Sequence, residues 1–108
     1  MVEGFWIVQT KVPEGIGGAV VMLMGGKIFG GDNAFTFLGT YYTDKATMKA
    51  KVTVQNFDPA VPSIFGLTAD YDLDVSVTIK GDSMEGTAMI SGQPTKSIAV
   101  LLKKKASL

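Results

Sequence analysis

Carboxylates and phenols are the side chains of this chain best suited to chemistry. Asp32 could serve as a base, with Tyr41 or Tyr42 as an acid. General acid–base catalysis needs a group whose pKa lies near neutral pH, and the chain has no His, Cys or Arg to provide or tune one. Asp32 also follows two glycines and precedes Asn33, a composition typical of a turn. We therefore expect no catalytic residues and no enzyme activity.

Three further carboxylates, Asp70, Asp72 and Asp74, have the alternate spacing of a calcium-binding loop. Tyr71 and Leu73 stand between them, however, and this strict alternation favours a strand with one wet face. The bidentate glutamate that closes a calcium loop is also missing. The sequence therefore predicts no metal site and no cofactor.

The charges of the chain are balanced, with ten basic and ten acidic residues. No net field attracts polyanions, and without arginine the bidentate contact to guanine or phosphate is missing, so we expect no nucleic-acid partner. Lys103, Lys104 and Lys105 are interpreted as a solubilising tail. The start of the chain lacks the pattern of a signal peptide, and the longest apolar run, 19–24, is too short to span a membrane. We expect a cytoplasmic protein with no membrane partner.

Apolar residues recur with a period of two between turn-forming residues, which indicates strands. Eight strands are predicted, at about 4–11, 18–24, 27–30, 35–42, 46–55, 71–80, 83–90 and 97–103. Gly25-Gly26 predicts a tight hairpin, and the one long connection, 56–69, has room for a short helical turn at 63–67. This order predicts a single all-β domain over 1–108, an eight-stranded up-and-down antiparallel barrel whose closure removes the exposed edges.

The alternation also predicts which strands pair in which register. In 46–55, Met48 and Ala50 lie on the buried face while Lys49 and Lys51 lie on the wet face. The next strand should be its antiparallel neighbour, so these lysines should lie across from Asp72 and Asp74.

Gly4-Phe5-Trp6 on the first strand resembles the G-x-W signature of lipocalins. In that family the tryptophan packs at the floor of the barrel beneath a basic residue of the last strand. The resemblance implies that the last strand closes onto the first.

A wider resemblance, to the GrlR family, rests on four short motifs: Gly30-Gly31-Asp32-Asn33-Ala34, Gly39, Pro62-Ser63 and Asp70-Tyr71-Asp72-Leu73. The family comprises small β-barrel negative regulators of type III secretion gene expression. The resemblance implies a calycin-like barrel that forms a homodimer and binds a transcriptional activator. This chain has Thr43-Asp44-Lys45-Ala46 at the turn where a family member carries an acidic recognition site.

Independently of that resemblance, the strand phase predicts an apolar outer surface. If Trp6 points inward, its neighbours on the first strand point outward, and the Gly25-Gly26 hairpin and the last strand add further apolar residues. Such a surface favours a homodimer, because soluble monomers rarely expose a large apolar patch. The predicted interface comprises Phe5, Ile7, Val20, Met22, Met24, Phe29, Ala99 and Leu101.

The interior of the barrel is the other candidate site. Eight strands give a lumen that side chains either fill or leave open for one small ligand. The candidate lumen residues are Trp6, Phe35, Phe37, Tyr41, Met48, Tyr71 and Met84, and small residues that could leave space are Ala19, Gly39, Ala50, Gly86 and Ala88. The main hypothesis is a noncatalytic regulator that acts through protein binding, and the alternative is a barrel that binds a small apolar ligand.

Overall fold

The computed structural model describes residues 2–12, 15–62 and 69–108, and these form strands and connections without a helix. The predicted all-β fold is confirmed. The eight strands are β1 (Gly4–Val12), β2 (Gly15–Met24), β3 (Lys27–Gly31), β4 (Phe35–Asp44), β5 (Thr47–Asn56), β6 (Tyr71–Lys80), β7 (Ser83–Ile90) and β8 (Ser97–Ser107).

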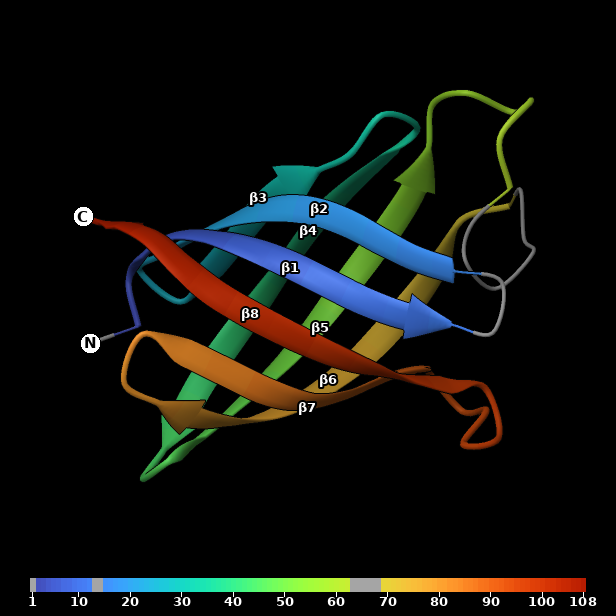
Figure 1. Ribbon diagram of the computed structural model, residues 1–108. Helices are drawn as coiled ribbons and strands as arrows, with labels where there is room; N and C mark the ends of the chain where they lie inside the picture. Colours follow the sequence, from blue (N-terminus) through green and yellow to red (C-terminus); the bar gives the residue numbers. More distant parts are fainter. Residues whose placement is uncertain (1, 13–14, 63–68) are drawn as a thin grey trace.

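Each strand pairs antiparallel with its neighbours in the sequence, and β8 pairs with β1 to close the sheet (Figure 1). The structure is therefore the predicted up-and-down barrel. Closure leaves each strand with a partner on both sides, although β3, at five residues, covers only part of β2. Alternate side chains consequently face either the lumen or the outside.

The two ends of the barrel differ in their connections. The chain termini and three two-residue turns lie at one end, which we call the floor, on the left of Figure 1. The longer connections lie at the opposite end, which we call the mouth. At the floor, Gly25 and Gly26 have φ angles of 59° and 80°, as a tight hairpin of the predicted kind requires.

The predicted register is confirmed at the β2–β3 hairpin and only in part between β5 and β6. Met24 pairs with Lys27 and Met22 with Phe29 across the turn between β2 and β3. On β5 and β6, Lys51 lies directly opposite Asp74, with 3.9 Å between the ammonium nitrogen and a carboxylate oxygen. Lys49 and Asp72 do not lie opposite each other or opposite another charge. Lys49 faces Ser76, while Asp72 faces Thr53 and accepts a hydrogen bond of 2.9 Å from its hydroxyl.

Several strands are longer than the sequence predicts. β2 begins at Gly15 rather than near residue 18, and β8 continues to Ser107. The extension of β8 follows from its pairing with Gly4 and Phe5, which carries the lysine run into the sheet. Residues 13–14, in the connection between the first two predicted strands, and the predicted helical turn at 63–67 lie outside the described residues.

Large side chains close the lumen at the floor. Trp6 and Met84 are both completely buried there. The indole nitrogen of Trp6 donates a hydrogen bond of 2.8 Å to the carbonyl of Val2, which satisfies the polar atom of a buried ring. The ammonium of Lys104, on the last strand, lies 5.4 Å from the centre of the Trp6 ring, within the range of a cation–π contact. This is the arrangement that the G-x-W resemblance implies.

Two inward positions, Gly39 and Gly86, let neighbouring strands approach more closely than any side chain would allow. A Cβ atom at either position would stand 2.1 Å from the carbonyl oxygen of Lys51 or Ser76, respectively. Glycines at such points allow a small barrel to bend sharply. We therefore assign these two glycines to the curvature of the sheet.

This assignment predicts that Gly39→Ala destabilises the barrel. The added methyl must displace backbone, so we expect the free energy of unfolding to fall by about 1–3 kcal/mol, the usual cost of overpacking. Gly18→Ala is the matched control, because the nearest atom to its Cβ is 4.0 Å away. Denaturant unfolding of both variants measures the difference, and equal stabilities would contradict the role given to Gly39.

Candidate functional site

The lumen contains a cavity of about 300 Å³ above the floor. Its deep walls are apolar and come from seven strands, all except β7. They are formed by Val8, Val21, Leu23, Ile28, Phe37, Met48, Ala50, Val52, Val75, Val100 and Leu102. Within the described residues, no polar or charged side chain is fully buried and no buried side-chain nitrogen or oxygen lacks a partner. The inner part of the cavity therefore suits an apolar group.

The lumen residues proposed from the sequence divide into two sets. Phe35, Phe37, Met48 and Tyr71 line the cavity. Trp6, Tyr41 and Met84 do not line it, and they belong to the packed core instead. Because Trp6 lies at the floor, a ligand in the cavity would reach its ring only indirectly.

The small residues proposed to leave space also divide. Ala19, Ala50 and Ala88 line the cavity, where their short side chains leave its volume open. Gly39 and Gly86 are not part of its wall, because the close approach of neighbouring strands takes up the space beside them. Sequence reasoning identified all five as inward but could not separate these two roles.

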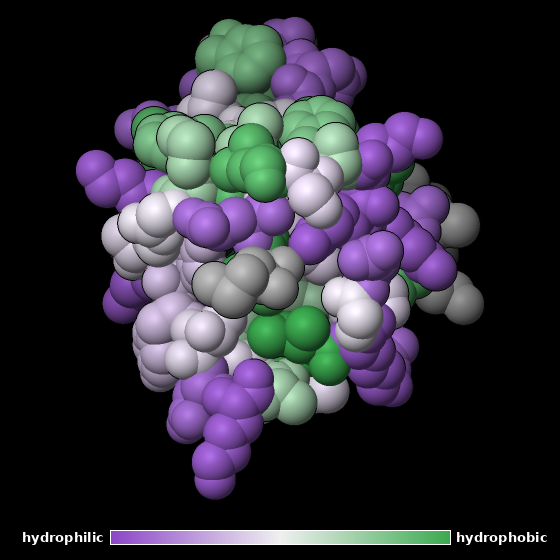
Figure 2. Space-filling view, turned by 90° about the vertical axis from the view of Figure 1, so that its left-hand side faces the viewer, coloured by the Kyte–Doolittle hydropathy of each residue, from purple (hydrophilic) through white to green (hydrophobic). Residues whose placement is uncertain are grey.

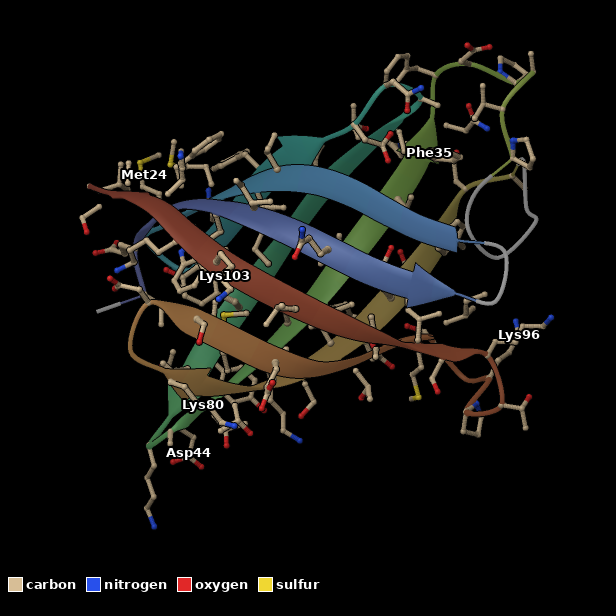
Figure 3. The ribbon with its side chains drawn as sticks, in the orientation of Figure 1. Met24, Phe35, Asp44, Lys80, Lys96 and Lys103 are labelled. Atoms are coloured by element: carbon tan, nitrogen blue, oxygen red, sulfur yellow. The ribbon has the colours of Figure 1, made fainter. Side chains whose placement is uncertain are left out.

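The mouth carries the polar part of the cavity wall. Thr10, Asp32, Asn33 and Tyr71 line the cavity there, and the exposure of Asp32 and Asn33 shows that it reaches the surface at this end. Figure 3 labels Phe35, which begins β4 at this end. The cavity is therefore amphiphilic, with an apolar interior and a polar entrance.

Asp32 is held in place by a turn, as the sequence predicts. Its Oδ1 atom accepts hydrogen bonds from the backbone N–H groups of Ala34 and Phe35, both at 2.9 Å. Phe57 then donates from its backbone N–H to the carbonyl of Ala34 at 2.9 Å. This chain of bonds joins the β3–β4 connection to the start of the long connection after β5, which are neighbouring parts of the mouth.

Further bonds shape the described part of that long connection. Asn56 donates from its side-chain amide to the carbonyl of Val61 at 3.1 Å and accepts a bond from the backbone N–H of Asp58 at 2.6 Å. The carboxylate of Asp70 accepts from the backbone N–H of Asn56 at 3.2 Å. Val61 and Pro62 are thereby positioned against the cavity.

Outside the lumen, a pair of charged residues lies on β6 and β7. The ammonium of Lys80 donates a hydrogen bond to the carboxylate of Glu85. This bond, together with the positive charge of Lys80, lowers the pKa of Glu85 below its usual value. Lys80 lies at the floor end of the barrel (Figure 3). The pair is therefore remote from the mouth.

Among the described residues, no three acidic, histidine or cysteine side chains group closely enough to hold a metal ion. In the same part of the chain, no helix has the length and apolar character to cross a membrane.

An apolar row crosses the outside of the barrel. Phe5, Met22, Phe29 and Leu38 pair in succession across β1, β2, β3 and β4, and we call these four residues the outer row. Phe29 and Leu38 expose 44% and 46% of their surfaces, so the row is open to solvent. In Figure 2, which views the floor end, apolar side chains gather in the upper part, where β2 and β3 lie in Figure 1.

The remaining predicted interface residues flank this row unevenly. Ile7 and Val20 pair with each other beside the outer row. Met24, labelled in Figure 3, is exposed near the β2–β3 turn. Leu101 instead lies opposite Gln9 and Glu85. Ala99 lies opposite Thr87. The apolar surface thus centres on β1 to β4, with polar neighbours around the residues of β8.

Sequence reasoning missed Leu38 as part of this surface. The signal was available, because Phe37 points inward and its neighbour on a strand must then point outward. Its pairing with Phe29 extends the row to a fourth strand.

In comparisons with known proteins, no family model and no curated protein matches this chain. The fold and the cavity define the class of protein instead: a closed eight-stranded antiparallel β-barrel with an apolar lumen that opens at a polar mouth.

Proposed function

We propose that this barrel binds one small apolar ligand in its lumen without transforming it. The observation that carries this proposal is the apolar cavity of about 300 Å³ that reaches the surface at the mouth. Small-molecule sites are concave, mostly apolar and furnished with a few polar groups, and this cavity is at the lower end of their usual size range. We therefore rank ligand binding in the lumen above the regulator hypothesis.

The volume sets the size of the ligand. The cavity has roughly twice the 150 Å³ of an engineered apolar cavity that binds benzene, so a ligand of about twelve non-hydrogen atoms fits. At roughly 0.5 kcal/mol per atom, between the limits for very small and drug-sized ligands, such a ligand binds with a dissociation constant of tens of micromolar.

The first test titrates the protein with primary alcohols by isothermal calorimetry. We expect affinity to rise from 1-hexanol to 1-decanol with one site per barrel, because each added methylene is buried in the lumen. Ala50→Leu should weaken 1-decanol binding at least tenfold by filling the cavity. Ala46→Leu, in the exposed turn at the floor, is the matched control and should bind like the parent.

Thermal unfolding of both variants shows whether they remain folded, and Ala88→Leu repeats the test from β7. No saturable heat with any alcohol would reject lumen binding. Undiminished binding in folded Ala50→Leu and Ala88→Leu would place the alcohol elsewhere.

A second candidate function is that of a noncatalytic regulator similar to the GrlR family, cytoplasmic and dependent on protein contacts. The observation that favours it is the exposed outer row with its flanking residues Ile7, Val20 and Met24. A second copy of the chain would cover this surface, and a transcriptional activator would be the further partner that the resemblance implies. Burial of apolar side chains supplies the free energy of such an association.

This candidate predicts that the parent chain is a dimer at micromolar concentration and that Met22→Lys is a folded monomer. A charge placed in the outer row must lose its water on association without a partner, which should weaken the dimer at least about 100-fold. Thr87→Lys, on the outside of β7, is the matched control and should remain dimeric.

Sedimentation velocity measures both states, and far-UV circular dichroism verifies the β-sheet. A monomeric parent would reject the outer row as a dimer interface, and so would a dimeric Met22→Lys variant.

A further inference from the structure

The polar groups of the cavity wall are confined to one end, and this restricts the head group of the ligand. Thr10, Asp32, Asn33 and Tyr71 all lie at the mouth, while the deep walls are apolar. Given the lumen binding proposed above, on which this inference rests, a ligand with one polar head enters tail first. Its head then remains beside the mouth residues.

Asp32 supplies the charge at that position. Its Oδ1 atom is engaged by the two backbone N–H groups of the turn. Its second oxygen, Oδ2, accepts no hydrogen bond from any other described residue, and the side chain is exposed. Asp32 therefore stands in the cavity wall at the mouth, with one carboxylate oxygen that the turn does not engage.

No basic side chain balances this carboxylate in the cavity wall formed by the described residues. Lys96 is the one basic residue in the sequence of the four connections at the mouth, and its side chain points away from the barrel (Figure 3). Lys104 faces inward, but its ammonium lies over the Trp6 ring at the floor and it does not line the cavity. The entrance thus attracts cations and repels anions.

We infer that the ligand is a small apolar amine, with its ammonium group beside Asp32 and its tail among the deep walls. A fatty acid of the same length would bring its carboxylate next to that of Asp32. Exposed charge pairs change affinity by up to about fivefold in either direction. Attraction of the amine and repulsion of the acid together should therefore separate the two affinities by about tenfold.

The experiment compares 1-aminodecane, 1-decanol and decanoate by calorimetry at pH 7, at low and at high salt. These probes share a ten-carbon tail and differ in the charge of the head. We expect the amine to bind about tenfold more tightly than decanoate, with the alcohol between them. High salt should reduce the difference, because this site is open to solvent.

Asp32→Asn removes the charge while its amide oxygen can still accept the two backbone bonds of the turn. In this variant the amine and decanoate should bind with similar affinity. Asp82→Asn, in the turn at the opposite end of the barrel, is the matched control and should keep the tenfold preference.

The outcomes separate this inference from the proposed function. Equal affinities for the three probes, or tightest binding of decanoate, would overturn the amine assignment and leave lumen binding intact. Failure of all three to bind would reject lumen binding and the amine assignment together. An amine preference that persists unchanged in Asp32→Asn would overturn the role of Asp32. If Asp32→Asn does not fold, the parent protein still tests the role of Asp32. An amine preference in the parent that does not change with salt would overturn that role.

Discussion

The pairing of β1 with β8 is the constraint on which the rest of this structure depends. Hydrogen bonds between the first and last strands turn a meander with two open edges into a closed barrel. The register shifts between Phe5 and Trp6, so that Trp6 pairs with Lys104. This shift brings the inward lysine over the indole ring at the floor. Closure thus fixes both the inner surface that encloses the cavity and the outer surface that carries the apolar row.

Much of this architecture could be predicted because it depends on local rules. A period of two assigns each residue of a strand to one of two faces, and short turns leave few choices of register. The pair Met22–Phe29 follows directly from these rules, whereas the exact register of β5 and β6, which are joined by a long connection, does not. The outward position of Phe29 and the inward position of Met48 follow in the same way.

The cavity could not be predicted because it depends on the curvature of the whole sheet. Ala50 and Gly86 are both small and inward, yet Ala50 lines the cavity while Gly86 lies against the backbone of β6. The distinction follows from how closely the strands approach one another, which no local pattern encodes. The place of Asp32 at the mouth depends equally on distant parts of the chain. The β3–β4 turn must come together there with the end of β1 and the start of β6.

The barrel offers an apolar surface on each side of the same sheet, and the central claim is that the inner one holds the ligand. Nuclear Overhauser effects between 1-decanol and the methyl groups of the protein test this claim most directly. We expect the terminal methyl of the alcohol to give contacts with Leu23, Met48 and Leu102, which line the deep cavity. Contacts with Met24 and Leu38 on the outside instead, without any to the deep residues, would contradict it.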